Sequence, residues 1–247
     1  MNTNTQKDIR GTRWLITGGG RGLGRAVALL AASMGAKVVI VARTRAETDE
    51  VVGRVRAEGG TAHAIVADIA DKDQTYAISG QAAALAGPID VLVHGAATLG
   101  PRPLATVLET PCEDLERALL VNVVGPHRLT RAVVPSMLLR ESGVVLHVSS
   151  DAALSAYPTW GAYGASKAAF ELLARTLAAE VEGTGVRSVI VDPGEMDTTM
   201  HADALPDADR ALLAQPAVVA RKLVRVVLDA ALGGNGARVA LATLGES

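Results

Sequence analysis

Short runs of branched aliphatic residues alternate with longer segments of helical periodicity along almost the whole chain. Seven such runs are predicted to be strands: 13–17 (RWLIT), 37–42 (KVVIVA), 62–67 (AHAIVA), 89–94 (IDVLVH), 143–148 (GVVLHV), 186–191 (VRSVIV) and 238–243 (RVALAT). Apolar residues recur at helical spacing between them, in segments such as 23–34, 113–139 and 170–181. The alternation predicts repeated βαβ units, and therefore a doubly wound α/β fold of about seven parallel strands with helices on both faces.

A single domain accounts for this pattern. No linker, low-complexity segment or shift of composition divides the 247 residues. Hydrophobic residues make up 49% of the chain but aromatic residues only 2%, and a core of small and branched aliphatic side chains suits strands buried on both faces. We expect one Rossmann-type domain over 1–247, with a flexible N-terminal tail at 1–10 and a substrate lid at 195–216.

The charge balance argues against several classes of partner. Lys and Arg number 24 against 26 Asp and Glu, and no basic block is present that would follow a nucleic-acid backbone. No apolar run is long enough to span a bilayer, and no signal peptide is recognisable. Cys112 is the single cysteine, and the five histidines share no ligand spacing, so neither a disulfide nor a metal site is expected. We expect a cytoplasmic protein that binds neither nucleic acid nor membrane.

The segment TGGGRGLG, residues 17–24, follows the first expected strand and leads into a helix. Gly18, Gly22 and Gly24 allow a tight turn and a close approach of the backbone to a phosphate. The helix that follows presents free amide groups and the positive end of its dipole. The spacing is TGxxxGxG rather than GxGxxG, because no register places a third glycine where that pattern needs one. A pyrophosphate is the expected occupant of this loop.

The end of the second strand is expected to determine the choice of cofactor. An acidic residue there would bind the ribose hydroxyls of NAD, but the sequence reads VIVARTR at 39–45 and contains no carboxylate. Arg43 and Arg21 can instead neutralise a 2′-phosphate, to which a guanidinium group is geometrically matched. The sequence therefore predicts NADP(H) rather than NAD(H).

Tyr163 and Lys167 lie four positions apart in WGAYGASKAAF, residues 160–170. On a helix this spacing places both side chains on one face, with about 6 Å of rise between them. A tyrosine has an ordinary pKa of about 10, so acid–base work near neutral pH requires about 4 kcal/mol of preferential phenolate stabilisation. A fixed ammonium group can supply much of this energy. Ser150, at the end of the fifth expected strand, is placed to hold the substrate oxygen that Tyr163 would protonate.

These motifs together resemble the short-chain dehydrogenase/reductase family, from TGGGRGLG through VSS and YGASK to VDPGEMDTTM at 191–200. The resemblance implies that Ser150 polarises the substrate oxygen and that Tyr163 is the general acid/base. It implies that Lys167 lowers the pKa of Tyr163 and contacts the nicotinamide ribose, and that Asn122, in LLVNVVG, holds a proton-relay water. It further implies that Asp68 contacts the adenine, while the PG and Thr segment at 193–198 lies along the nicotinamide carboxamide. The full set expected to bind the cofactor is Gly18, Arg21, Gly22, Leu23, Gly24, Arg43, Asp68, Gly95, Lys167, Pro193, Gly194 and Thr198.

The chain departs from the family pattern in two places. His94, Gly95, Ala96 and Ala97 stand where members of the family usually have NNAG. RVALATLGES, residues 238–247, replaces the usual Gly-containing strand and DGG tail. By position alone, the pocket for the substrate is expected to include Ala152, Tyr157, Trp160 and Glu195.

The expected function is NADP(H)-dependent hydride transfer between the nicotinamide and a small-molecule carbonyl or secondary alcohol, in the direction of carbonyl reduction. A 3-oxoacyl reductase or an alcohol dehydrogenase of the same family is the alternative within this class. A non-catalytic dinucleotide sensor or scaffold is the alternative outside it, although such a protein needs none of the four catalytic residues. Relatives pair through the helices that correspond to 112–139 and 163–182, so a homodimer or homotetramer is expected.

Overall fold

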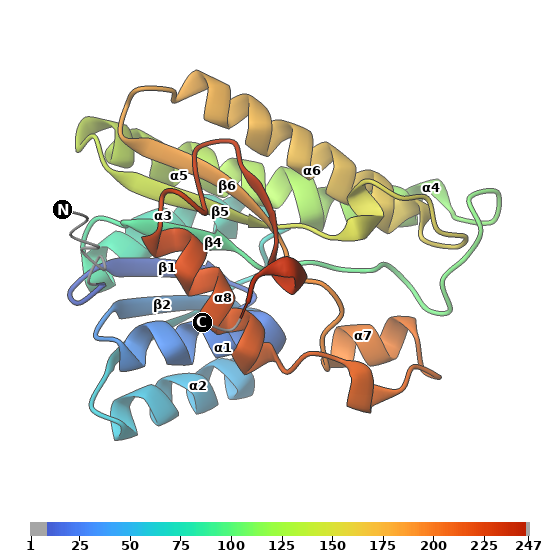
Figure 1. Ribbon diagram of the computed structural model, residues 1–247, viewed down its shortest axis with the longest axis horizontal. Coiled ribbons are helices and arrows are strands. Elements are labelled where there is room, and N and C mark those ends of the chain that lie inside the picture. The colour runs from blue at the N-terminus through green and yellow to red at the C-terminus, as the bar shows by residue number, and fades with distance from the viewer. Residues whose placement is uncertain (1–8, 246–247) are drawn as a thin grey trace.

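The computed structural model describes residues 9–245, and residues 1–8 and 246–247 lie outside this range (Figure 1). The expected flexible tail at 1–10 therefore lies largely outside the described residues, but Ile9 packs against the core and is 3% exposed. The seven strands are β1 (Arg13–Thr17), β2 (Lys37–Ala42), β3 (Thr61–Val66), β4 (Val91–His94), β5 (Gly143–Val148), β6 (Val186–Asp192) and β7 (Arg238–Ala240).

All seven strands belong to one parallel sheet in the order β3-β2-β1-β4-β5-β6-β7. The strand order reverses between β1 and β4, which lie side by side although two strands separate them in the sequence. A crevice at the carboxyl ends of the strands is expected at such a switch point. The predicted doubly wound α/β fold is thus confirmed.

Helices cover both faces of the sheet, as Figure 1 shows. The helices are α1 (Gly22–Ser33), α2 (Arg45–Ala57), α3 (Lys72–Ala86), α4 (Cys112–Leu119), α5 (Gly125–Leu139), α6 (Gly161–Glu180), α7 (Thr199–Ala204) and α8 (Pro216–Leu228). Side chains of α1, α2 and α8 form one core cluster with the sheet, and those of α3 and α5 form a second cluster on the opposite face.

Strand β1 illustrates why these sequences become central strands. Trp14 and Ile16 point into the first cluster and Leu15 into the second, and all three side chains are fully buried. A strand covered on both faces needs apolar residues at consecutive positions, which is what the RWLIT run provides. Within residues 9–245, no helix has the length and apolarity needed to cross a bilayer.

Strands β3, β4 and β6 differ by one or two residues from the predicted 62–67, 89–94 and 186–191, and two other elements differ more. The segment 113–139 is not one uniform helix, because a π-helical turn at Leu120–Val124 separates α4 from α5. The last strand ends at Ala240 instead of continuing to 243, because Leu241–Thr243 forms a 3₁₀ turn that buries Leu241 completely.

Candidate functional site

A cleft of about 330 Å³ opens at the carboxyl end of the sheet, around the ends of β1 and β4. Eleven of the twelve residues expected to bind the cofactor line it: Gly18, Arg21, Gly22, Leu23, Gly24, Arg43, Asp68, Gly95, Lys167, Pro193 and Thr198. Gly194 is not among the lining residues, and its backbone N–H donates a hydrogen bond to Asp192 Oδ1 at 3.0 Å. Tyr163 also lines the cleft, together with the neighbour of Ser150, Ser149.

The glycine loop connects β1 to α1 and packs too tightly for side chains. A Cβ atom on Gly18, whose φ is +71°, would lie 2.8 Å from the backbone of Gly95 and Ala96, and one on Gly24 would lie 2.3 Å from the carbonyl oxygen of Gly18. In the described structure no side chain caps α1, because Arg21 precedes it with an extended backbone and no capping hydrogen bond. The first-turn amide groups of α1 are therefore left for a ligand in the cleft.

The turn after β4, where the sequence departs from NNAG, is braced by Thr17. The backbone N–H groups of Gly95 and Ala96 donate to Thr17 Oγ1 at 3.1 and 3.2 Å. His94 points away from the cleft and places Nε2 2.8 Å from Thr130 Oγ1 on α5. Although the sequence here differs from NNAG, the turn keeps a close contact with the glycine loop through the hydroxyl group of Thr17.

Charged side chains gather at the cofactor end of the cleft. Arg21 and Arg43 are exposed and line it, as the sequence predicts. Glu47, from the first turn of α2, lines the same region, and its carboxylate lies close to Gly20. Asp68 follows β3 and forms an ion pair of 2.9 Å with Arg117 from α4. The region therefore holds both the arginines that suit a phosphate and a carboxylate that the sequence analysis did not anticipate.

Tyr163 and Lys167 line the cleft, and Ser150, which is not among the lining residues, forms a hydrogen bond with Tyr163. Ser150 Oγ donates to Asp151 Oδ1 at 3.0 Å and accepts from the N–H of Ala152 at 3.2 Å, so it begins a 3₁₀ turn. Tyr163 and Lys167 lie in α6 and are 7% and 4% exposed. Lys167 Nζ donates to the carbonyl oxygen of Val148 at 2.8 Å and lies 5.5 Å from the centroid of the Tyr163 ring.

The protonation equilibria of Tyr163 and Lys167 are set mainly by burial. Desolvation raises the pKa of Tyr163 to about 12; a hydrogen bond with Ser150 opposes this shift, and the charges of Asp151 and Asp192 add to it. Desolvation lowers the pKa of Lys167 to about 8, against the charge of Glu171. For Tyr163 this is the reverse of the lowered pKa that the sequence predicts, because burial of the phenol disfavours the charged phenolate.

Asn122 lies in the π-helical turn between α4 and α5 and is 2% exposed. Its Oδ1 accepts from the N–H of Thr98 at 2.8 Å, while Nδ2 donates to Thr98 O at 2.8 Å and to Ser166 Oγ at 2.9 Å. Both amide hydrogens are therefore engaged in holding the loop after β4 against α6. The role of Asn122 in a proton relay stays a prediction, and such a water would have to bind elsewhere than at Nδ2.

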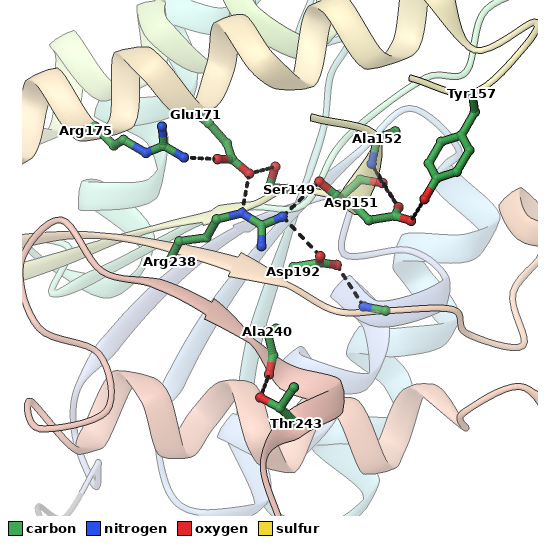
Figure 2. Close-up of polar contacts among 12 residues, drawn as sticks. Ser149, Asp151, Ala152, Tyr157, Glu171, Arg175, Asp192, Arg238, Ala240 and Thr243 are labelled. Atoms are coloured by element: carbon green, nitrogen blue, oxygen red, sulfur yellow. Dashed lines mark hydrogen bonds and ion pairs between the residues drawn. The ribbon is translucent and has the colours of Figure 1, made fainter. Parts of the chain in front are cut away.

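A buried charge network lies behind the 3₁₀ turn that Ser150 begins (Figure 2). Glu171, one helical turn after Lys167, is 2% exposed. Its Oε1 accepts from Ser149 Oγ at 2.6 Å and from Arg238 Nε at 2.9 Å, and its Oε2 accepts from Arg175 Nη2 at 2.5 Å. The network thus joins α6 to β7 and to the end of β5.

Arg238 is the centre of this network. Its Nη2 donates to the backbone oxygen of Ser150 and to Asp192 Oδ2, both at 3.1 Å. Burial alone would lower the pKa of Arg238, but Glu171 and Asp192 raise it above its ordinary value. The guanidinium group therefore stays charged and holds the ends of β5 and β6 together beside the 3₁₀ turn that Ser150 begins.

The segment after β6 lines part of the cleft through Met196, Thr198, Thr199 and Met200, and its role as a lid stays a prediction. Thr198 caps α7 by accepting from the N–H of His201 at 3.2 Å. The ends of the segment are joined by a parallel bridge between Met196 and Ala214. Of the four residues expected to line the substrate pocket, Ala152 and Trp160 pack around Tyr163. Tyr157 is exposed instead and donates to Asp151 Oδ2 at 2.7 Å.

Four residues that brace or line the candidate site were not singled out from the sequence: Thr17, Glu47, Glu171 and Arg238. Glu171 carried a usable signal, since it follows Lys167 at helical spacing on the same face, but its partner is 67 residues away. Among residues 9–245 no group of three or more His, Cys, Asp or Glu side chains is arranged to bind a metal ion. Cys112 is exposed at the start of α4.

Comparison with known proteins gives matches over most of the chain. A family model described as short chain dehydrogenase matches residues 13–209. A short chain dehydrogenase of Pseudocercospora fijiensis is 41% identical over 212 residues, which cover 83% of this chain and 67% of the relative. A fatty acyl-CoA reductase of Mycobacterium tuberculosis is 34% identical over 236 residues, covering 92% of this chain and 80% of the relative.

Solved structures agree over nearly the full length. A protein of Beutenbergia cavernae assigned as an NAD(P)-dependent gluconate 5-dehydrogenase, with bound NADP, has a TM-score of 0.87 at 30% identity and matches over 95% of this chain and 96% of its own. A 7α-hydroxysteroid dehydrogenase complexed with NADH has a TM-score of 0.87 at 26% identity, over 97% and 96%. Dinucleotides with the 2′-phosphate (NADP) and without it (NADH) are therefore both found in proteins of this shape.

Proposed function

The chain belongs to the short-chain dehydrogenase family of oxidoreductases, and on that basis we propose that it is an NADP(H)-dependent reductase of small carbonyl compounds. The position of Tyr163 carries the proposal: this buried phenol, hydrogen-bonded with Ser150, stands in the same cleft as a glycine loop and an uncapped helix N-terminus. In the reverse direction the substrate is the corresponding secondary alcohol.

The residues of the cleft fit a dinucleotide. Gly22 begins α1, and a Cβ atom there would meet only Thr198, at 3.5 Å, so the backbone is open to a ligand on that side. Amide groups of the first turn suit a pyrophosphate, as does the helix dipole. When bound, a nicotinamide cofactor supplies the hydride for carbonyl reduction, and Lys167, Pro193 and Thr198 are the residues proposed to hold its nicotinamide half.

Cofactor choice is proposed to be a balance between Arg43 and Glu47. Arg21 and Arg43 favour a 2′-phosphate, whereas Glu47 would repel it and would suit free ribose hydroxyls. The absence of a carboxylate at the end of β2 supports NADP(H), and the bound NADP of the Beutenbergia cavernae structure is compatible with this choice. Glu47 belongs to α2 rather than to the strand end, so it is expected to reduce the preference without reversing it.

Fluorescence titration with NADPH and NADH tests this choice directly. We expect Arg43→Asp to weaken NADPH binding about 10- to 100-fold, the value of one charge-assisted hydrogen bond, and not to weaken NADH binding, because a carboxylate there can bind the ribose hydroxyls. Glu47→Gln should increase the preference for NADPH. Arg45→Asp is the matched control, because Arg45 is exposed nearby but does not line the cleft. An unchanged ratio in Arg43→Asp would refute the role of Arg43.

Proton transfer is proposed to pass through Tyr163. In carbonyl reduction the phenol O–H bond breaks as its proton passes to the substrate oxygen, while the carbonyl carbon accepts hydride from the cofactor. A pKa raised to about 12 keeps Tyr163 protonated at neutral pH, which is the form that reduction needs. Ser150 would hold the same oxygen once its hydroxyl turns from Asp151. Reduction is the proposed direction, and the protonated phenol of Tyr163 is the group that would donate the proton in it.

The test of the function is NADPH oxidation with a panel of aldehydes and ketones. We expect Tyr163→Phe to abolish turnover while NADPH binding survives. Tyr76→Phe is the matched control, because Tyr76 is 45% exposed on α3 and does not line the cleft. Near-normal turnover in Tyr163→Phe would remove Tyr163 as the acid.

Two alternatives make different predictions in the same assays. The fatty acyl-CoA reductase among the relatives favours an acyl substrate, and acyl-CoA should then be reduced faster than any free ketone. A dinucleotide sensor or scaffold should bind NADPH with no turnover of any carbonyl, and Tyr163→Phe should then have no effect. The engagement of Ser150 with Tyr163 supports an enzyme over a sensor.

Self-association through α4, α5 and α6 is also part of the proposal. These helices expose apolar side chains, among them Leu172 at 64% and Leu173 at 41%. Exposed leucines on helices of this kind suit an isologous interface. Size-exclusion chromatography with light scattering should show a dimer or tetramer, and a monomer at high protein concentration would count against this interface.

A further inference from the structure

The end of β5 is held from one face of α6. Lys167 Nζ donates to the last backbone carbonyl of β5 at 2.8 Å. Glu171 lies four residues further along α6, and therefore on the same face, and its Oε1 accepts from Ser149 Oγ at 2.6 Å. Ser150 comes next in the chain and forms a hydrogen bond with Tyr163, on the same face of α6. The helix thus contacts each step of the backbone that leads to Ser150.

Arg238 reaches the same backbone from β7, the edge strand of the sheet. Its Nε donates to Glu171 Oε1 at 2.9 Å, and its Nη2 donates to the backbone oxygen of Ser150 at 3.1 Å. The same oxygen accepts from the N–H of Ala153 at 3.1 Å, which closes the 3₁₀ turn. Glu171 and Arg238 are bonded to each other and together hold two consecutive residues, Ser149 and Ser150.

The guanidinium group also reaches the segment that borders the cleft after β6. Its Nη2 donates to Asp192 Oδ2 at 3.1 Å (Figure 2), and Asp192 Oδ1 accepts from the N–H of Gly194 at 3.0 Å. Pro193, between these two residues, lines the cleft. One arginine therefore fixes the turn of Ser150 relative to the turn that follows β6.

An ion pair of this kind is not needed to keep β7 in the sheet. β7 pairs with β6 through its backbone, in a register that runs from Ile190 with Arg238 to Asp192 with Ala240. A buried ion pair adds little stability compared with apolar residues of similar size, because both charges lose hydration. An apolar side chain at position 238, however, could not donate to the backbone oxygen of Ser150.

We infer that Arg238 is a positioning residue of the reaction, which acts through the backbone of Ser150 to hold the Ser150 hydroxyl beside the phenol of Tyr163. The inference rests on the proposed function, because Ser150 and Tyr163 are taken to be the groups that meet the substrate oxygen. Arg238 is not among the residues that line the cleft, so it acts on the rate through Ser150. Displacement of a reacting group by about 1 Å can lower a rate by about 100-fold.

A double-mutant cycle on kcat tests the inference, with wild type, Arg238→Met, Ser150→Ala and the double variant. The probe is 4-nitrobenzaldehyde at saturating NADPH, and kcat is expressed per molecule that binds NADPH. We expect Arg238→Met to lower kcat at least about tenfold. Ser150→Ala keeps the backbone oxygen but has no hydroxyl to position, so in this background the same change should alter kcat by less than about twofold. Equal factors in the two backgrounds overturn the inference.

Arg175→Met is the matched control for the cycle. Arg175 donates to the other oxygen of Glu171, Oε2, and not to the backbone of Ser150, so kcat should stay within about twofold of wild type. If Arg238→Met does not fold, Arg238→Met/Glu171→Gln replaces it, because that variant has no unpaired buried charge and equally lacks the donor to Ser150. The expected loss of kcat and its dependence on the Ser150 hydroxyl are the same, and a wild-type kcat overturns the inference.

Hydrogen exchange gives a readout that needs no turnover. The N–H of Ala153 bonds to the oxygen that Arg238 holds, so it should exchange at least about fivefold faster in Arg238→Met but not in Arg175→Met. Its rate is compared with that of the β1 amides, which report global unfolding. Unchanged relative exchange in Arg238→Met overturns the inference.

The two hypotheses fail in different ways. If the wild-type protein reduces no carbonyl compound, the proposed function fails, while exchange at Ala153 still decides whether Arg238 holds Ser150. If carbonyl compounds are reduced and Arg238→Met keeps its kcat, the reductase function stands and the inference on Arg238 is overturned.

Discussion

We expect Arg238→Met to lower the free energy of unfolding by about 2.5 kcal/mol, because it leaves Glu171 buried without its inward partner. Arg238 donates to Glu171, Asp192 and the backbone oxygen of Ser150, and its side chain is only 19% exposed. Removal of one partner from a buried ion pair costs about 3–5 kcal/mol. The expected loss lies just below this range, since Glu171 keeps its bonds to Arg175 and Ser149.

The assay is a double-mutant cycle measured by urea unfolding. Glu171→Gln removes the buried charge but retains an acceptor for Ser149, so the double variant should be more stable than Arg238→Met alone by about 1 kcal/mol or more. A loss of about 2.5 kcal/mol should also lower the melting temperature by about 5–10 °C for a domain of this size.

Arg175→Met supplies the control, because Arg175 binds the same carboxylate from the solvent side with its side chain 45% exposed. Its loss should cost about 1 kcal/mol at most. Equal losses of unfolding free energy for Arg238→Met and Arg175→Met, or additive losses in the Arg238→Met/Glu171→Gln double variant, would refute the reasoning that burial makes the Arg238–Glu171 pair the more important one for stability.

Two further predictions concern other parts of the fold. Burial lowers the pKa of His147 to about 3 and that of His94 well below its ordinary value, so the unfolded chain binds protons below pH 6.5 that the folded protein does not. The contribution of these two histidines to the free energy of unfolding should therefore be fully present above pH 7 and should fall by about 1.4 kcal/mol per buried histidine between pH 7.5 and 5.5. Unfolding measured over this pH range tests it: His147→Asn should halve the pH dependence, and the exposed control His127→Asn should leave it unchanged. Gly24→Ala should abolish NADPH binding in a fluorescence titration, because its Cβ atom would lie 2.3 Å from Gly18 O. The control Gly53→Ala on α2 has no atom within 4 Å of its Cβ, so it should bind NADPH normally and gain up to about 1 kcal/mol of stability. Normal binding in Gly24→Ala would contradict the tight packing of the loop.

The fold could be predicted because local periodicity and burial agree along the chain. The strands 13–17, 37–42 and 143–148 have the predicted boundaries, since each is a run of apolar residues covered on both faces. The π-helical turn at 120–124 could not be predicted, because its apolar spacing resembles that of an ordinary helix.

The candidate site was predictable only where its residues form a local pattern. Tyr163 and Lys167 share one helix face, and the glycine loop is continuous in sequence, so spacing alone places them. Glu47 reaches the cleft from the next helix, and Arg238 meets Glu171 across 67 residues. Spacing also says nothing about desolvation, and it is desolvation that raises the pKa of Tyr163 where the sequence predicts a lowered one.

The long-range pair of Glu171 and Arg238 has a consequence for synthesis. At a translation rate of about 5–20 residues per second, the 67 residues between them take about 3–13 s to make. The rest of α6 and then β6 are made within that interval, while the carboxylate of Glu171 still lacks Arg238 as its inward partner and its burial is less favourable. The contacts that join β5, α6 and β6 at this turn are therefore complete only once β7 has been made, and until then Arg175 and Ser149 are the partners of Glu171.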